Sequence, residues 1–322
     1  MRDLITQSAR RLLETHLPEV AVRQSRTGRL PDGWQAMTKS GLLLALRPDS
    51  GIGRADALAL AEVAGAHASP GPIAETMLAN WLLGLAGLPP ATGPATVAVL
   101  AGAAINDGQL TGRAAGVPWA MPGVEIIAIG GGALVRSWAP ALLAEPSISG
   151  LPRASVTVAA SVAAKAPEVD IQAAMAALRT HEIAGALATI LAMTTEWTGT
   201  RVQFGKPLSR NQAVQHGLAR LASEAAAAGA AASLAAGAFG RADTRLTIAA
   251  AKARASEAAG IGAGIAHQLH GAIGFTADHR LHLFTRALWQ WRDDAGNEHD
   301  WAAELGAATL AAPTFWPMVT AL

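Results

Sequence analysis

The sequence has no cysteine among its 322 residues, and charged side chains make up only 15% of it. Without cysteine there is no disulfide, no thiolate nucleophile and no cysteine-based metal or iron-sulfur site. The G-x-S-x-G pattern that marks a serine nucleophile is also missing. These absences exclude several classes of enzyme that depend on a sulfur or serine nucleophile.

Charge of one sign is not concentrated anywhere in the chain. The 25 Lys and Arg nearly balance the 24 Asp and Glu, and neither sign forms a long run. Neither nucleic acid nor an anionic membrane surface is therefore predicted as a partner. The first residues lack the apolar core of a signal peptide, which favours a cytoplasmic location. The longest uncharged stretch, 76–106, is divided by "GLPPATGP" into pieces too short to cross a bilayer.

The hydrophobic residues, 51% of the chain, are enough for a large buried core. Residues 1–90 read as an N-terminal helical domain, 91–165 as a small β domain, and 166–322 as a bundle of four long helices. The sequence thus predicts a mainly α protein with a small β middle domain. The three glycines 130–132 fit a hairpin turn better than a phosphate-binding loop, because no lysine follows at the required spacing.

Two histidine patterns raise the question of a metal site. His267 and His270 are three apart on a predicted helix, a spacing compatible with metal ligation, but no carboxylate accompanies them at a suitable spacing. His181 and Glu182 begin a zinc-protease pattern, yet Gly185 stands where the second histidine is needed. No metal is predicted.

Two long segments carry a resemblance to a known family. "RVQFGKPLSRNQAVQHGLARLASE", residues 201–224, resembles the R-x-Q-F-G-K-P-[IL] signature of the acyl-CoA dehydrogenases and the Q-A-V-Q-H helix that follows it. "QLHGAIGFTADHRLHLFTR", residues 268–286, resembles a second block of the same family in the expected order. The family's architecture is an N-terminal helical domain, a β-barrel domain and a C-terminal four-helix bundle, which agrees with the pattern along this chain.

The resemblance implies a reaction and a cofactor. In this family FAD takes hydride from the β-carbon of an acyl-CoA thioester while a glutamate removes the α-proton, and an electron-transfer flavoprotein or similar acceptor reoxidises the flavin. The proton can leave only if the thioester oxygen is polarised and the carboxylate is desolvated enough to act as a base. The cofactor supplies the redox chemistry, and the protein positions it.

The family's cofactor contacts map onto this sequence residue by residue. Arg201 matches the arginine beside the FAD pyrophosphate, and Asn297 lies where the family has a threonine near the cofactor. In the family such groups reach the FAD of a neighbouring subunit, so an oligomer is implied. The other matching positions are Phe204, Asn211, Gln212, Gln268, Gly271 and Ala272.

The family's catalytic base is missing at both of its known positions. Nine residues after Arg286 the chain has Ala295, followed by the expected Gly296, and the other base position holds Met175. Neither side chain can take a proton. The family's T-E-P-x-A-G-S-D stretch, which meets the flavin ring, is also not found between residues 88 and 167.

These losses resemble the shorter subunit of heteromeric acyl-CoA dehydrogenases of the steroid-CoA type, in which a longer partner carries the base. The sequence therefore predicts an FAD-site-completing subunit without its own catalytic glutamate, working in lipid or steroid catabolism. One alternative is a self-sufficient homo-oligomeric dehydrogenase with Asp294 as the base. Another is a flavin-free scaffold subunit.

Overall fold

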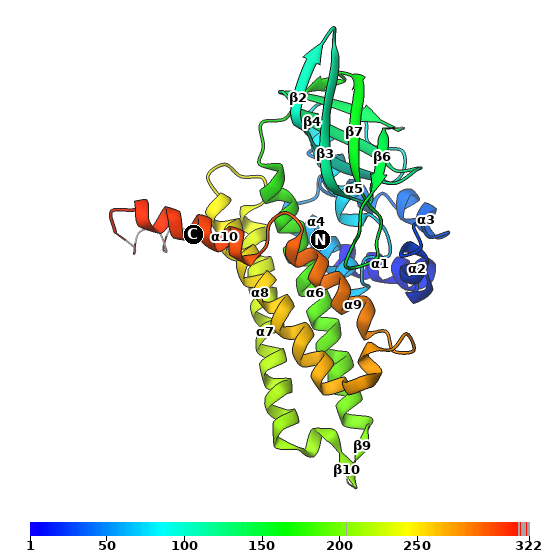
Figure 1. Cartoon of the computed structure of the whole chain (residues 1–322), viewed down its shortest axis with the longest axis vertical. Helices are drawn as coiled ribbons and strands as arrows, with labels where there is room; N and C mark the ends of the chain where they lie inside the picture. Colours follow the sequence, from blue (N-terminus) through cyan, green and yellow to red (C-terminus); the bar gives the residue numbers. More distant parts are fainter. Residues whose placement is uncertain (139, 204, 315, 317–319, 321–322) are drawn as a thin grey trace. The chain divides into compact units, whose positions relative to one another are not determined.

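The computed structural model describes residues 1–138, 140–203, 205–314, 316 and 320 (Figure 1). These residues form two compact units. The first consists of residues 1–60 and 69–171, and the second of 61–68 and 172–322. The division into domains 1–90, 91–165 and 166–322 stays a prediction, although the strands β1 to β8 do fall between residues 95 and 165.

The helices of the first unit follow from regularly spaced apolar residues. In α1 (Arg2–His16), Ile5, Ala9 and Leu13 recur every four residues and are buried, while the residues between them face water. Such a pattern is typical of an amphipathic helix on the surface of a folded unit. The remaining helices are α2 (Glu19–Ser25), α3 (Trp34–Lys39), η1 (Leu42–Leu44), α4 (Arg54–Ala66), whose end enters the second unit, and α5 (Ile73–Leu85).

The strands of the first unit form two four-stranded sheets, in the orders β1-β4-β5-β8 and β2-β3-β7-β6. Gly131 and Gly132 have φ of +56° and +77° and turn β4 into the antiparallel β5, so the predicted hairpin turn is confirmed. A cluster of buried Ala, Val, Leu and Ile fills the β core. The strands are β1 (Ala95–Val99), β2 (Ala101–Asn106), β3 (Gln109–Pro118), β4 (Glu125–Gly130), β5 (Ala133–Ser137), β6 (Ala141–Ala144), β7 (Arg153–Ser161) and β8 (Ala164–Lys165).

The second unit is helical, as predicted. Three long helices, α6 (Ile171–Thr200), α7 (Gln212–Ala238) and α8 (Arg245–His270), are followed by the shorter α9 (Leu281–Asp293) and α10 (Glu298–Ala311). In Figure 1, α6 to α9 run side by side. The connections contain β9 (Val202–Gln203), β10 (Lys206–Pro207), η2 (Leu208–Arg210) and η3 (Gly271–Phe275).

Glycines bring the end of α4 against α6 within the second unit. A Cβ on Gly185 would lie 1.9 Å from the carbonyl oxygen of Glu62, and one on Gly65 would lie 2.0 Å from that of Glu182. Only glycine permits such a close backbone approach. Gly185 therefore has a packing reason at the place where a zinc-protease helix would need histidine.

Among the described residues, no helix is long and apolar enough to cross a membrane. The prediction of a mainly α fold with a small β part is confirmed.

Candidate cofactor-binding site

A cavity of about 600 Å³ opens at one end of the helical unit. It lies where α6 ends, α7 begins and α8 ends, so residues far apart in the sequence share its wall. Its lining residues are Trp197, Arg201, Gln203, Leu208, Ala213, Val214, Gln268, Leu269, His270, Gly271, Ala272 and Ile273.

Local sequence explains why the helices stop at this cavity. After α6 the chain reverses through a two-residue ladder, with Gly205 at φ +77° in the turn. Asn211, with φ −90° and ψ 131°, is the residue before α7. Gly271 ends α8 with φ +67°, and a Cβ there would meet nothing within 4 Å. The cavity wall therefore consists largely of residues at or next to helix ends.

The polar groups of this cavity suit an anionic ligand. Arg201 is exposed, and among the described residues its guanidinium has no ion pair; it lies 5.9 Å from the centre of the Trp197 ring. Gln203 and Gln268 add exposed carboxamides, and no Asp or Glu belongs to the lining. A cation and amide donors beside small residues form a site that phosphate oxygens can approach closely.

Four of the residues expected to bind the cofactor meet in this cavity: Arg201, Gln268, Gly271 and Ala272. Asn211 and Gln212 do not line it, but they directly precede the lining residues 213 and 214 on α7. Phe204 lies outside the described residues. The role of each as an FAD contact stays a prediction.

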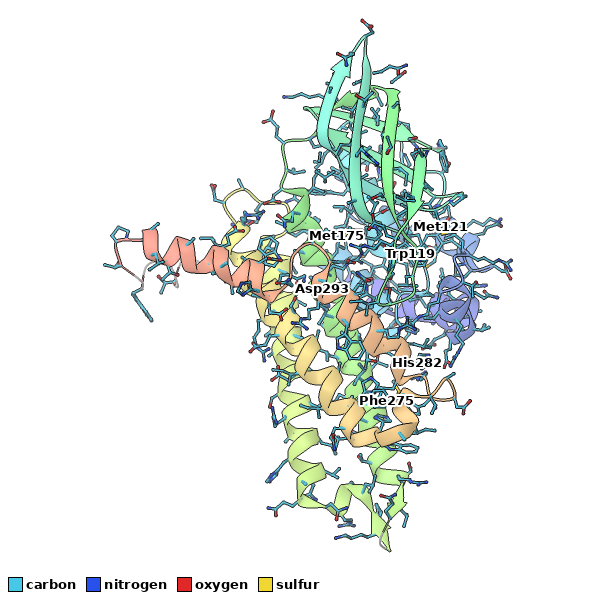
Figure 2. All side chains as sticks on the ribbon, viewed as in Figure 1. Trp119, Met121, Met175, Phe275, His282 and Asp293 are labelled. Carbon is cyan, nitrogen blue, oxygen red and sulfur yellow. The ribbon has the colours of Figure 1, made fainter. Side chains whose placement is uncertain are left out.

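A second cavity of about 480 Å³ shares Gln268, Gly271 and Ala272 with the first. Its other walls include three rings from α8, η3 and α9. The His267 ring lies between Phe275, at 4.2 Å and an interplanar angle of 21°, and Trp289, at 5.8 Å and 18°. Figure 2 labels Phe275, which is 69% exposed on the turn after α8.

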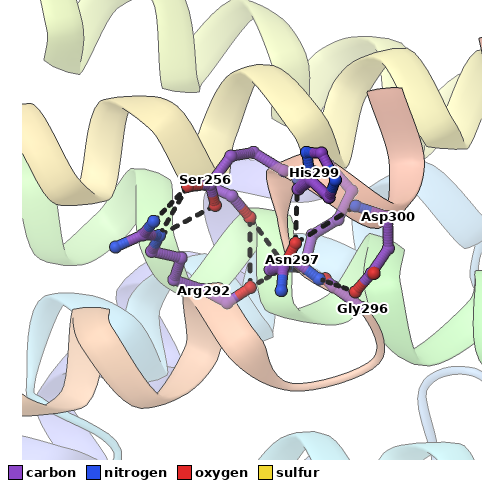
Figure 3. Close-up of polar contacts among 8 residues, drawn as sticks. Ser256, Arg292, Gly296, Asn297, His299 and Asp300 are labelled. Atoms are coloured by element: carbon purple, nitrogen blue, oxygen red, sulfur yellow. Dashed lines mark hydrogen bonds and ion pairs between the residues drawn. The ribbon is translucent and has the colours of Figure 1, made fainter. Parts of the chain in front are cut away.

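The turn after α9, residues 292–300, carries the position of the missing base. Ala295 has φ +59° and Gly296 has φ +98°, so this turn adopts a conformation that side chains with a Cβ rarely take. The indole N–H of Trp301 donates to the carbonyl oxygen of Ala295 at 3.1 Å. Figure 3 shows the polar contacts that surround Gly296 and Asn297.

Asn297 is used in the structure as a helix cap. Its side-chain oxygen accepts from the backbone N–H groups of His299 and Asp300, at 2.8 and 3.1 Å, and the Asp300 carboxylate accepts from the Asn297 N–H at 3.0 Å (Figure 3). This reciprocal capping box starts α10. Asn297 does not line the cavity with Arg201. Its contact with the cofactor therefore stays a prediction, whereas its role as the cap of α10 is seen in the structure.

Lys252 fastens this turn to α8. The side chain is fully buried, and its Nζ donates to Ser256 Oγ at 2.7 Å and to the carbonyl oxygens of Arg292 at 2.7 Å and Gly296 at 2.8 Å. Burial lowers the pKa of Lys252 to about 7, although the nearby Asp294 carboxylate acts in the opposite direction. Three acceptors match the three donors of an ammonium group.

Asp294, the candidate base, is 3% exposed and forms an ion pair with Arg179 at 3.1 Å. Gln290 Nε2 donates to its other oxygen at 2.9 Å. Arg179 is itself buried and also pairs with Glu182. Both oxygens of the Asp294 carboxylate therefore have partners within its own unit, and these contacts would have to break before Asp294 could reach a substrate.

The other acids of this turn differ in their surroundings. Partial burial raises the pKa of Asp293, and the positive charge of Arg292 offsets part of this increase. Hydrogen bonds from Arg292 lower the pKa of Glu298. Met175 on α6, at the second base position, is half-buried and carries no ionisable group (Figure 2).

Sequence reasoning missed Lys252 and Arg179. Both lie within alanine-rich helices without any motif, and only the burial of their charged ends, 0% and 2% exposed, makes them notable. Nothing in the short-range pattern around either residue marks it as buried, since Arg254 lies two residues after Lys252, and His181 and Glu182 follow Arg179. In the described part of the chain, no group of three or more His, Asp or Glu side chains is arranged so that it could hold a metal ion.

Comparisons with known proteins agree with this geometry. Residues 170–289 match the acyl-CoA dehydrogenase C-terminal domain. Over 118 residues the chain is 37% identical to the acyl-CoA dehydrogenase IpdE2 of Mycobacterium tuberculosis, which covers 37% of this chain and 36% of that relative. The match thus spans about a third of the relative's length. The resemblance to the acyl-CoA dehydrogenase family is confirmed, and residues 170–289 match its C-terminal domain.

Solved structures extend the likeness of the fold to nearly the whole chain. The Tcur3481–Tcur3483 steroid ACAD superimposes with a TM-score of 0.84 and 21% identity over 97% of this chain and 99% of that one. The ChsE4–ChsE5 complex from Mycobacterium tuberculosis gives 0.77 and 18% over 97% and 98%. The chain therefore has the acyl-CoA dehydrogenase fold.

Proposed function

We propose that this chain is the FAD-site-completing subunit of an acyl-CoA dehydrogenase and contributes no catalytic base of its own. The main observation behind this proposal is that an open cavity contains the cation Arg201, whereas the position of the catalytic base is occupied by Ala295. The reaction is the α,β-desaturation of an acyl-CoA thioester.

The residues of the cavity fit FAD, the cofactor that the family match supports. Arg201 would neutralise phosphate oxygens, Gln268 would donate from its amide, and Gly271 and Ala272 would leave room for close approach. The absence of any lining carboxylate is consistent with a pyrophosphate there. When bound, FAD accepts the hydride of the desaturation.

The pairing of Asp294 argues against a self-sufficient dehydrogenase. A base at that residue would have to leave Arg179 and Gln290, and it would leave a buried guanidinium without one of its counterions. The fixed Ala295–Gly296 turn offers no carboxylate in its place. The base would therefore come from another subunit.

The partner in this proposal is a longer acyl-CoA dehydrogenase subunit. Two solved relatives of this fold bear paired names, Tcur3481–Tcur3483 and ChsE4–ChsE5, the second titled as a complex, and the first is titled a steroid ACAD. A steroid or other bulky acyl-CoA is the substrate class that this analogy favours. Electrons would pass to an electron-transfer flavoprotein or similar acceptor, and the assembly would work in the cytoplasm.

The test is to purify the chain alone and together with the product of a neighbouring dehydrogenase gene, and to record flavin absorbance and thioester-dependent bleaching. We expect flavin and activity only in the two-subunit complex. Activity of the single chain would overturn the proposal, and a complex without flavin would point to a scaffold subunit.

Asp294→Asn separates the two sources of the base. In the proposed heteromer, the variant retains turnover per folded molecule, because the carboxylate is structural. If Asp294 is the base, turnover falls by about 10²–10⁴-fold. Asp293→Asn is the matched control, since it removes the neighbouring charge and leaves the Arg179 pair in place.

A further inference from the structure

Four histidines gather beside the cavity, where α8 passes through η3 into α9. His267 and His270 belong to the last turn of α8, His279 to the following turn, and His282 to the first turn of α9. The rings of His270 and His279 lie 4.7 Å apart, and both contact Trp197 of the cavity wall, at 5.8 and 5.9 Å. We call these four residues the histidine cluster.

The two α8 histidines bracket the part of the wall that holds Gln268. His270 is 5% exposed, and its Nδ1 lies 2.8 Å from the Ala266 carbonyl oxygen, so Nδ1 carries a proton and donates it. Its Nε2 is buried without a hydrogen-bond partner in the described part of the chain. A neutral ring of this tautomer leaves Nε2 as an unused acceptor.

His267 is placed in a similar way. It is 6% exposed, its Nε2 lies 2.9 Å from Thr285 Oγ1, and its Nδ1 has no partner among the described residues. Gly274 of η3 packs closely on both side chains, since a Cβ there would lie 3.0 Å from His270 Cβ and 3.4 Å from His267 Nδ1. His270 lines the first cavity and His267 the second, but the nitrogen of each ring that has no partner is itself buried.

A proton added to either ring has no acceptor in this arrangement. At His270 the new Nε2–H would be buried beside Trp197 and the other histidines, and burying an unpaired charge is costly. The electrostatic effects on His270 come from His279 and His267, and that on His267 from His282, all of the same sign when protonated.

Charged groups on the adjoining elements do not supply a counterion to these rings. Glu196 on α6, Arg201 directly after it, Asp278 and Arg280 on the turn, and Arg286 on α9 are the nearest along the chain, and none of them is among the causes that shift the pKa of His267 or His270.

We propose that the histidine cluster makes ligand binding at the Arg201–Gln268 cavity acid-sensitive, with the wall intact while the rings are neutral and opened when they take up protons. The identity of the ligand as FAD rests on the proposed function. The direction agrees with the titration of the rings, since burial lowers the pKa of His270 to about 4 and also lowers that of His267. Between pH 4 and the ordinary histidine value of 6.5, the unfolded wall binds protons more strongly than the folded one, so acid favours opening.

The test measures the affinity of the full chain, in its complex where a partner co-purifies, for FAD at pH 7 and pH 5. We expect wild-type affinity to fall by about tenfold or more over this range, the consequence of one to two protons taken up on opening. His270→Asn should lose most of that pH dependence, because its amide still donates to Ala266 and cannot be protonated. His299→Gln, on the exposed start of α10, is the matched control and should behave as the wild type.

A second readout does not depend on FAD. The fluorescence of Trp197, obtained as the difference between wild type and Trp197→Phe, should change as the neighbouring rings titrate, and this change should vanish in His270→Asn. An unchanged acid transition in His270→Asn would overturn the inference whether or not FAD binds. Absence of FAD binding at neutral pH, with the His270-dependent transition present, would instead overturn the proposed function and leave the acid-sensitive wall in place.

Discussion

The cavity and the turn 292–300 belong to the same helical unit, and the same family resemblance drew attention to both, yet they use their polar groups in opposite ways. At the cavity, Arg201 and Gln268 are exposed and form no ion pair with the described residues. At the turn, Asp294 pairs with Arg179, and Arg292 pairs with Glu298. Charged groups are thus open to a ligand in one region and satisfied internally in the other.

The difference shows that density of charge is a poor guide to chemistry. The segment "WQWRDDAGNEHDW" is the most acidic stretch of the last helices, but most of its acids are engaged: in an ion pair, a bidentate contact with arginine, or a helix cap. The cavity has one cation and no acid. A ligand site is better recognised by unpaired donors on helix ends than by the number of charges.

The largest expected effect comes from breaking the buried pair at the turn. Asp294→Ala should lower the free energy of unfolding by about 3–5 kcal/mol, because Arg179 remains buried with one counterion fewer. Chemical denaturation measures this loss. Glu257→Ala, which breaks an exposed pair with Arg254 at 3.3 Å, should cost about 1 kcal/mol or less. Equal losses at the two sites would remove the distinction between a closed turn and a solvated surface.

Lys252 should give the turn a pH dependence above pH 7, a range separate from the acid transition proposed for the cavity wall. Its folded pKa is about 7 against 10.5 as the ordinary value, so between these values the unfolded chain binds more protons and stability rises with pH. The slope is at most about 1.4 kcal/mol per pH unit.

Lys252→Met should remove this slope between pH 7 and pH 9.5, as measured by denaturation at several pH values, while the exposed Lys206→Met should keep it. A slope that survives in Lys252→Met would assign it to another group.

At the cavity, removing the charge of Arg201 should weaken ligand binding and leave the free energy of unfolding nearly unaltered. Arg201→Gln should weaken FAD binding by about 10–100-fold, the effect of losing a charge-assisted hydrogen bond of about 1.5–3 kcal/mol. Arg220→Gln on the exposed face of α7 is the control. Fluorescence titration with FAD compares them. If both variants bind equally well, Arg201 is not the anion contact.

The smallest effect concerns the backbone of the turn. Ala295→Gly should stabilise the protein by about 1 kcal/mol or less, since φ +59° favours glycine. Ala253→Gly within α8 should instead destabilise the protein by about 1 kcal/mol, because glycine is less favourable than alanine inside a helix. Thermal unfolding of the two variants distinguishes them by sign.

Much of the fold was readable from local pattern. The helical spacing of Leu4, Ile5, Leu12 and Leu13 indicates a helix, although Leu4 is exposed in the structure, and the β-branched runs between Gly and Pro indicate strands. Periodicity and turn residues act within a few positions of one another, so a single sequence displays them. The close approach of α4 and α6 at Gly65 and Gly185 could not be predicted in this way, because neither segment contains a pattern that shows which segment it packs against.

The site was readable in part, through its motifs. Arg201 and Gln268 were identified from two segments, and the structure brings both into the lining of one cavity, while their contact with FAD stays a prediction. The ion pair of Asp294 could not be predicted from the sequence, since its partner Arg179 lies 115 residues earlier in the chain (294 − 179). From spacing alone, Asp294 could not be distinguished from the neighbouring acids.

By itself, the sequence determined the order of helical, β and helical segments, the family signatures and the alanine where a base would be needed. These depend on residue identity and short-range spacing. Only the tertiary structure decided which charged side chains are paired within the protein and which remain open to a ligand. Ion pairing and desolvation depend on distances between groups from different helices, and those distances exist only after α6, α8 and α9 have packed together.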